Sequence, residues 1–367
     1  MRTLLLTGPE SESQRAVSRA LKLALTERGD TNLSVGALAL LGQHAPLSQT
    51  RTMEQEALST PRAFAFLSAG NAFLREQKRK SLVYEVNALY AKNLSTLLKE
   101  GEFDAVLCLH RYPAEAVSYL RRTITFSARC CYLSCDFACV PFLEEAALDH
   151  YFTAHESLTG AYQRRGITAK KIIPAGIPLP KDWFRTEEKA DARALLNLPQ
   201  GVPCYFIPYA ADPAAAVLAL LDRMKGDSSR ICVVSPDGAP PKSPFVARFA
   251  GDVRVAVLAP EDPLPLYRSA CDVMLAAPSG ALSAGAAATG TPLVHLPTTD
   301  QFEAQTAHFF SSHGLSLAGK SYEDSAALAL TLAREEARKE MMRLNQLSAI
   351  ISNAAQRVAR FLHEGRL

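Results

Sequence analysis

The clearest indication of the fold comes from Cys130–Pro180, which reads CCYLSCDFACVPFLEEAALDHYFTAHESLTGAYQRRGITAKKIIPAGIPLP. The short apolar run Cys131–Leu133 predicts a strand, and Asp149–Thr153 predicts a second strand after an acidic loop. A helix that ends at Gly166 and a third strand over Lys171–Pro174 are predicted next. Strand, helix and strand in this order indicate parallel pairing, because a crossover helix is the short way to bring the chain back.

Two polar side chains of this stretch are candidates for chemistry. Asp136 lies just beyond the carboxyl end of the first strand, where open parallel sheets place ligand-binding groups. A loop-capping role explains Asp136 equally well, because Asp side chains hydrogen-bond the backbone of turns. His155 stands beside Glu156, and the pattern favours a helix-start residue over a proton-transfer group.

Length and composition indicate a globular protein of two domains. The chain has 367 residues, of which 48% are hydrophobic and 21% are charged. Its 40 Lys and Arg residues against 37 Asp and Glu residues give a net charge of +3. This near balance favours no particular partner, and no basic stripe with interleaved aromatic residues is present, so nucleic-acid binding is not expected.

The sequence contains no apolar run long enough to span a bilayer, and Met1–Leu6 leads into a turn rather than a cleavage site. We therefore expect a cytoplasmic protein that touches a membrane only from its surface. The region Phe64–Lys80 combines aromatic residues with a cationic cluster, which suits a helix resting on an anionic bilayer. An ordinary amphipathic helix with a solvated charged face is the alternative.

Four of the eight cysteines fall within ten residues, and they raise the question of a metal site: Cys130, Cys131, Cys135 and Cys139. A structural zinc site usually has Cys pairs in two separate segments. Neighbouring residues of a strand also point to opposite faces, so adjacent cysteines do not easily share one ion. We expect no metal here, and reduced cysteines that pack as small apolar side chains.

Strands and helices alternate over most of the chain. The first series opens with the strand Arg2–Thr7, and a second series runs from Cys204 to Leu296 after a charged linker over Leu179–Asp191. The pattern predicts an α/β protein with two Rossmann-like, doubly wound domains that face a cleft. The predicted parts are an acceptor-side domain over 1–180, a nucleotide-sugar-side domain over 181–320 and a helical tail over 321–367.

Five signals between Cys130 and Pro180 resemble one family of proteins. They are Cys135-Asp136-Phe137, Asp149-His150-Tyr151-Phe152, His155-Glu156, Arg165-Gly166-Ile167 and Gly176-Ile177-Pro178. Their order is similar to that in the monogalactosyldiacylglycerol synthases and processive diacylglycerol glucosyltransferases, which have the GT-B fold. The resemblance implies a two-domain transferase with a lipid acceptor, whose helical tail crosses back to the first domain.

The first turn departs from the resembled family. There a Gly-rich loop ends in a His that is a possible base, whereas here the turn ends with Gln14. An amide is not a useful proton acceptor near neutral pH, so any general base lies elsewhere. The resemblance makes Asp136, or another group in the cleft, the candidate catalytic residue for the acceptor proton.

The second half also matches the nucleotide-sugar segment of the family, in four pieces: Leu266–Leu275, Pro278–Ala287, Gly290–Val294 and Gln301–Gly314. The resemblance implies that Gly280 and Ser283, at a helix start, meet the diphosphate of the donor. It implies that Glu303 contacts the hexose. The expected donor is a UDP-sugar, bound as a substrate, and no cofactor is expected.

Three features of the family's donor site are altered. Its paired glycines are replaced by Ser279-Gly280, and the position of its ribose-binding carboxylate holds Gly285. The other phosphate loop, Pro208–Pro213, contains no glycine. Loss of a charged hydrogen bond to ribose costs on the order of 1.5–3 kcal/mol, which weakens donor binding without abolishing it.

The matches to the family and the altered donor site together leave two functions open. The first is a glycosyltransferase that moves a hexosyl group from a UDP-sugar to a diacylglycerol-type or other lipid acceptor, without a metal. The second is a catalytically degenerate GT-B relative that serves as a binding or regulatory protein. A sugar-nucleotide epimerase is a third interpretation, which the segment around Asp136 fits poorly.

Overall fold

The computed structural model describes most of the chain, in segments that cover residues 1–8, 11–36, 84, 91–208, 214–225, 229–235 and 243–366. The predicted membrane-facing helix in Phe64–Lys80 lies outside these residues, as do residues 209–213 of the glycine-free loop. The chain forms two compact units. Unit 1 comprises residues 1–180, 299–302 and 351–367, and unit 2 comprises residues 181–298 and 303–350.

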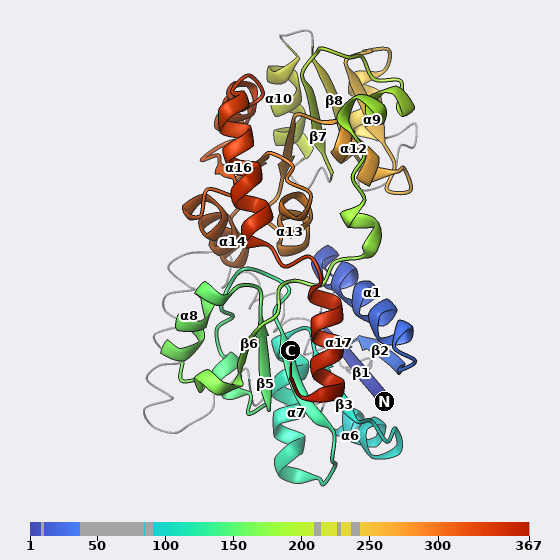
Figure 1. Cartoon of the computed structure of the whole chain (residues 1–367), viewed down its shortest axis with the longest axis vertical. Coiled ribbons are helices and arrows are strands. Elements are labelled where there is room, and N and C mark those ends of the chain that lie inside the picture. The colour runs from blue at the N-terminus through green and yellow to red at the C-terminus, as the bar shows by residue number, and fades with distance from the viewer. Residues whose placement is uncertain are drawn as a thin grey trace. The chain divides into compact units, whose positions relative to one another are not determined.

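Unit 1 is built on one parallel sheet of six strands in the order β2-β1-β3-β4-β5-β6 (Figure 1). Its strands are β1 (Arg2–Thr7), β2 (Thr31–Gly36), β3 (Ala105–Cys108), β4 (Arg129–Leu133), β5 (His150–Thr153) and β6 (Ile172–Pro174). Its helices are α1 (Glu12–Glu27), α6 (Ala91–Glu100), α7 (Arg111–Thr123), α8 (Thr159–Arg164) and α17 (Ala354–Glu364), with the short 3₁₀ turns η1 (Leu143–Glu145), η2 (Glu156–Leu158) and η3 (Ala169–Lys171).

Unit 2 contains a second parallel sheet of six strands, in the order β12-β11-β10-β7-β8-β9. Its strands are β7 (Cys204–Ile207), β8 (Arg230–Val234), β9 (Val255–Leu258), β10 (Val273–Ala276), β11 (Leu293–His295) and β12 (Leu317–Ala318). Its helices are η4 (Lys181–Phe184), α9 (Lys189–Leu195), α10 (Ala214–Met224), α11 (Pro244–Phe249), α12 (Leu264–Ala270), α13 (Gly280–Ala288), α14 (Gln301–Ser312), α15 (Tyr322–Leu332) and α16 (Glu336–Ala349).

The central strands of both sheets are continuous apolar runs. Strands β3 and β7, with sequences AVLC and CYFI, are buried over their whole length. This is the pattern of parallel strands that are covered on both faces by helices. The two doubly wound α/β domains predicted from the sequence are therefore confirmed.

Each sheet has one point where the strand order reverses, and such a switch point is where open α/β sheets bind ligands. In unit 1 it lies between β1 and β3, and in unit 2 it lies between β7 and β10. We therefore expect the loops that follow the carboxyl ends of these four strands to bind ligands.

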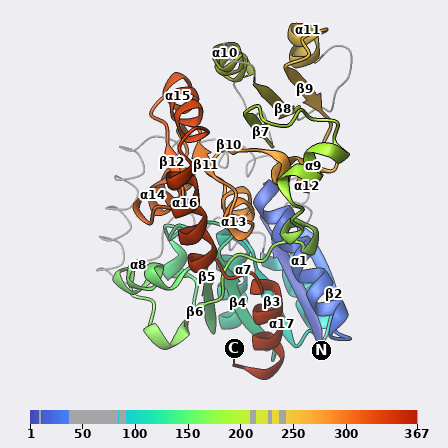
Figure 2. The same ribbon diagram turned by 45° about the horizontal axis from the view of Figure 1, so that its top comes forward.

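Helix α17 completes the core of unit 1, although it is the last helix of the sequence. It packs beside α1 (Figure 1 and Figure 2). The guanidinium of Arg129, on β4, donates hydrogen bonds of 2.9 Å to the carbonyl oxygens of Phe361 and Leu362. The ring of Phe361 meets Phe152 edge to face, with 5.2 Å between ring centroids. The cation at a helix C-terminus and the buried aromatic pair both favour this docking.

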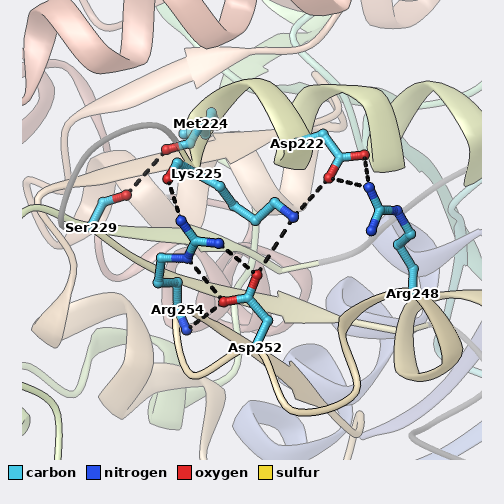
Figure 3. Close-up of polar contacts among 7 residues, drawn as sticks. All are labelled: Asp222, Met224, Lys225, Ser229, Arg248, Asp252 and Arg254. Atoms are coloured by element: carbon cyan, nitrogen blue, oxygen red, sulfur yellow. Dashed lines mark hydrogen bonds and ion pairs between the residues drawn. The ribbon is translucent and has the colours of Figure 1, made fainter.

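A polar network ties the amino ends of β8 and β9 to helix α10 (Figure 3). Arg254 donates to both carboxylate oxygens of Asp252 and to the carbonyl oxygen of Lys225. Hydrogen bonds from the Arg254 side chain and backbone hold the pKa of Asp252 well below its usual range. At the surface, Arg248 donates two hydrogen bonds of 2.9 Å to Asp222.

All eight cysteines are buried as free thiols, as expected of core residues. Burial raises the pKa of Cys130 and of Cys139 to about 12 each, so both thiols stay protonated near neutral pH. Within the described parts of the chain, no group of three or more His, Cys, Asp or Glu residues is arranged to hold a metal ion.

Candidate functional site

In unit 1 the switch point brings together Gly8, which follows β1, and His110, which lies two residues after β3. A Cβ atom added to Gly8 would lie 2.3 Å from Cγ of His110, far inside van der Waals contact. Only glycine leaves room for the imidazole against the backbone here. This close approach places His110 directly over the first turn of the fold.

Gln14 holds the turn that His110 touches. Its side-chain oxygen Oε1 accepts a hydrogen bond of 2.8 Å from the Gly8 N–H, and the residue is buried. The hydroxyl of Ser11, the N-cap of α1, accepts from the Gln14 N–H at 3.2 Å. Gln14 therefore joins the end of β1 to the start of α1, and its amide does so without any proton transfer.

His110 is the residue of this site that sequence reasoning missed. It is the N-cap of α7, and its Nδ1 accepts a hydrogen bond of 3.2 Å from the Tyr112 N–H. With Nδ1 as the acceptor, a neutral imidazole carries its proton on Nε2, so the outer nitrogen is a donor. The available signal was its position, directly after a buried strand and before a helix.

Asp136 lies in the turn after β4, and it is half-buried. The Ser134 hydroxyl donates to the Asp136 carbonyl at 2.8 Å, so the turn is locally fixed. The preceding thiol, Cys135, donates to the carbonyl of Leu109 at 3.6 Å, which joins this turn to the loop that carries His110. Asp136 and His110 therefore stand on adjoining loops at the carboxyl edge of the sheet.

His155 has the structural role that the sequence favoured. It is the N-cap of η2, and its Nδ1 accepts from the Ser157 N–H at 3.2 Å. The same nitrogen lies 2.9 Å from the Ser157 hydroxyl. A capping histidine of this kind stabilises the start of the turn.

A cavity of about 290 Å³ opens beside the first turn of unit 1. Its walls carry three cations of α1, together with the hydroxyls of Thr7, Ser18 and Ser34. The cations, spaced along one face of the helix, are Arg15, Arg19 and Lys22. Positive charge and hydroxyl groups suit a polar or negatively charged head group.

In unit 2 the switch point is followed by helix α13. Ser279 is its N-cap and accepts from the Leu282 N–H at 3.4 Å, and Gly280 is its first residue. The helix begins immediately beyond the carboxyl end of β10. The backbone N–H groups and the positive end of the dipole at a helix start favour a negatively charged ligand such as a phosphate.

Ser283 is directed into the interior of unit 2. Its hydroxyl lies 3.0 Å from Nε2 of His295, and both residues are fully buried at 0% exposure. On the other side of the ring, the Ser316 hydroxyl lies 3.2 Å from Nδ1. Burial lowers the pKa of His295 to about 3, so the ring is neutral and exchanges one hydrogen bond with each serine. In this arrangement the Ser283 side chain joins α13 to β11 and does not face the loop.

Gly285 lies against the indole ring of Trp183. A Cβ atom added at this position would be 2.6 Å from Cε3 of the ring and 3.5 Å from Nη1 of Arg268. The space beside Gly285, where the sequence resemblance implied a ribose-binding carboxylate, is therefore filled by Trp183 from the start of unit 2. The glycine could be read from the sequence, but its contact with the Trp183 ring could not be predicted from it.

Glu303 lies in the first turn of α14 and is half-buried. The Thr298 hydroxyl donates to its Oε2 at 2.6 Å, which orients the carboxylate. The Asp300 carboxylate accepts from the Phe302 N–H at 2.8 Å and so closes the turn before the helix. A carboxylate held in this way can accept hydrogen bonds from sugar hydroxyls.

Residues 14–179 match the model of a family described as monogalactosyldiacylglycerol (MGDG) synthase. The match lies within unit 1 and confirms the resemblance to this family that the sequence indicated. A search of curated proteins finds no match to the chain.

Three solved structures show the similarity of the whole fold. MurG of Acinetobacter baumannii is 13% identical over 99% of each chain, with a TM-score of 0.63. The spinosyn rhamnosyltransferase SpnG, complexed with thymidine diphosphate, is 14% identical over 99% of this chain and 100% of its own, with a TM-score of 0.61. A UDP-GlcNAc 2-epimerase from Neisseria meningitidis, bound to UDP-GlcNAc, is 14% identical over the same shares, with a TM-score of 0.59.

The two parallel sheets and these neighbours define the chain as a protein of the GT-B fold. Within that fold, its N-terminal half is similar to glycosyltransferases of the MGDG synthase type. No helix in the described ranges is both long and apolar enough to cross a membrane.

Proposed function

We propose that this protein is a glycosyltransferase that moves a hexosyl group from a UDP-sugar to a diacylglycerol-type or other lipid acceptor. The observation that carries the proposal is the match of residues 14–179 to the MGDG synthase family. The start of α13 at the switch point of the second sheet supports a nucleotide-sugar donor, because it suits a diphosphate.

The donor is proposed to bind in unit 2, as a substrate and without a metal. The N–H groups at Gly280 meet the diphosphate, and the Glu303 carboxylate accepts hydrogen bonds from the hexose. Ser283 acts through structure, since its hydroxyl holds α13 to the buried His295. Helix N-termini stabilise the negative charge that develops on the leaving diphosphate.

The acceptor is proposed to bind in unit 1. Its hydroxyl oxygen attacks the anomeric carbon, the bond to the diphosphate oxygen breaks, and the acceptor proton passes to Asp136 or to water. A carboxylate on the loop beside His110 can accept that proton, and the Nε2–H of His110 can donate a hydrogen bond to the acceptor.

A lipid acceptor requires contact with a membrane surface. We propose that the cytoplasmic protein reaches an anionic bilayer through Phe64–Lys80, and the cationic cavity of α1 supports a site for a polar lipid head group. Sedimentation with vesicles that contain anionic lipid tests this contact. Equal recovery with neutral vesicles would contradict it.

Calorimetric titration with UDP and a panel of UDP-sugars tests the donor. We expect micromolar binding of at least one UDP-sugar. Glu303→Ala should weaken it by about 10- to 150-fold, the equivalent of one hydrogen bond to a charged group, while UDP affinity stays unchanged. Glu261→Ala, which alters an exposed carboxylate of the same unit, is the matched control.

Transfer is then assayed with the sugar that binds and with diacylglycerol presented in vesicles. Donor binding with no transfer to any lipid would move the proposal to another acceptor. Absence of binding to every nucleotide tested would overturn the transferase proposal and favour the degenerate relative, for which the packing of Trp183 on Gly285 is the supporting observation.

A further inference from the structure

Arg268, on α12, is a buried cation on which the carboxylate of Asp182 acts only from beyond ion-pair distance. It is 7% exposed, and among the described residues it forms no ion pair. Its Nη2 donates to the Trp183 carbonyl, whereas its Nε has no hydrogen-bond partner. Burial lowers the pKa of Arg268 to about 10, so the guanidinium remains charged at neutral pH. A buried charge that lacks a partner is costly unless another group compensates it.

Arg268 lines a cavity of about 250 Å³ that belongs entirely to unit 2. The cavity is also lined by Cys271, just before β10, and by Thr291 and Pro292, just before β11. It therefore lies at the amino ends of these strands, at the edge opposite to the start of α13. The start of α13, where the donor diphosphate is proposed to bind, is not part of the cavity walls.

The three acidic side chains on the walls of the cavity already have cationic partners. Glu187 accepts from Arg185 at 2.9 Å, and Glu336 accepts from Lys339 at 2.7 Å. Glu340 accepts two hydrogen bonds of 2.8 Å from Arg343. None of these carboxylates is paired with Arg268.

The ends of α12 and α13 at the cavity do not require Arg268 either. Arg193 donates from its Nε to the carbonyl of Ala270, the last residue of α12, at 2.9 Å. The Thr289 hydroxyl lies 3.1 Å from the carbonyls of Gly285 and Ala286, near the end of α13. Other side chains therefore satisfy these carbonyls of α12 and α13, whereas Arg268 donates to the carbonyl of Trp183 in η4.

We propose that this cavity binds a small oxyanion, with Arg268 as its central ligand. The guanidinium of Arg268 on the cavity wall supplies the positive charge for the anion, and the hydroxyls of Thr289 and Thr291, 3.0 Å from each other, stand on the same wall. The volume is below the roughly 300–1,000 Å³ typical of sites for larger organic ligands, which favours inorganic phosphate or a similar ion. The described lining residues include four cations and three carboxylates, so the walls carry one positive charge in excess, which has the matching sign.

Titration of the full chain with inorganic phosphate, against chloride at matched ionic strength, tests the proposal by calorimetry and thermal unfolding. We expect one saturable site and a rise in Tm with phosphate. Arg268→Met should weaken binding at least tenfold and reduce the rise in Tm. Arg248→Met, which removes an exposed cation of the same unit, should leave both unchanged.

Hydrogen exchange of the wild-type chain locates the anion even if Arg268→Met does not fold. Protection by phosphate of residues 264–271 and 289–292 would support the proposal. Protection confined to residues 278–283 would place the anion at the start of α13 and overturn it. The absence of saturable binding, or equal binding by a folded Arg268→Met, would also overturn it and leave a cavity that holds only water.

Discussion

The indole ring of Trp183 lies against the backbone of Gly285, so that a Cβ atom at Gly285 would come within 2.6 Å of the ring. This contact explains why position 285 holds glycine. The other residues of α13 are mostly alanine, which favours a helix more than glycine does. It also joins the first turn of unit 2 to helix α13. Since Trp183 is the single tryptophan of the chain, its fluorescence reports directly on the folding of unit 2.

Gly285→Ala should destabilise unit 2 by about 1–3 kcal/mol, because the added methyl group overpacks the contact with Trp183. Urea unfolding followed by circular dichroism, which reports on both units, measures the change. Gly160→Ala is the control, since the nearest atom to its Cβ is the end of the Arg164 side chain at 3.5 Å. Alanine should be neutral or stabilising there. An equal loss of stability in both variants would contradict the proposed contact.

Gly8→Ala should destabilise unit 1 by about 1–3 kcal/mol, because the new Cβ meets the base of the His110 side chain, which cannot move aside without its backbone. Gly36→Ala is a matched control at the end of the paired strand, where the nearest atom lies 3.6 Å away. Thermal unfolding followed by circular dichroism measures both variants. If Gly36→Ala lost as much stability as Gly8→Ala, the close approach of His110 would not be the cause.

Asp272 joins three segments of unit 2. It accepts hydrogen bonds from Lys189 Nζ at 2.9 Å, Arg193 Nη2 at 2.7 Å and the Cys204 N–H at 2.8 Å. Burial by itself raises the pKa of Asp272, but these donors together hold it below its usual range. Asp272→Asn leaves the buried Arg193 without its counter-charge and should cost about 3–5 kcal/mol.

The surface carboxylate Asp222, which pairs with Arg248, is the comparison for this variant (Figure 3). Its pair is exposed to solvent, so Asp222→Asn should cost no more than about 1 kcal/mol. Tryptophan fluorescence in urea measures both substitutions in the same unit. If the two substitutions lowered the free energy of unfolding by similar amounts, the hydrogen bonds of Asp272 would not be what holds the three segments together.

The buried His295 predicts a specific dependence of stability on pH. Its pKa is about 3 in the folded chain, below the 6.5 of the free side chain, so the unfolded chain binds more protons between these values. The stabilising contribution is complete above pH 6.5 and is lost as the pH falls toward 3. From this group alone, unit 2 should be about 2 kcal/mol less stable at pH 5 than at pH 8.

His295→Gln tests this dependence, because glutamine can both donate and accept hydrogen bonds but does not titrate. The free energy of unfolding of wild type and variant is measured by fluorescence at several values of pH. The difference between the two should shrink as the pH falls from 7 to 5. A constant difference over that range would assign the acid sensitivity of unit 2 to other groups.

Local pattern predicted the two parallel sheets and the order of the strands along the chain, because buried strands such as Cys131–Leu133 stand out from the helices between them. It also predicted the helix-start position of His155. The contacts of Ser283 with His295 and of Gly285 with Trp183 could not be predicted in this way, since each joins residues that only tertiary packing brings together. His110 was missed for the same reason: its importance comes from Gly8, which lies about one hundred residues earlier.

The return of α17 to unit 1 has a consequence for how the protein acquires its structure. During synthesis the ribosome delivers residues 181–350 before the helix that packs on α1 and Arg129 exists. Most of unit 1 is therefore made first, but its last helix follows unit 2. The surface on which α17 packs stays exposed while unit 2 is made. A chaperone that covers this surface until α17 is made would raise the yield of folded protein.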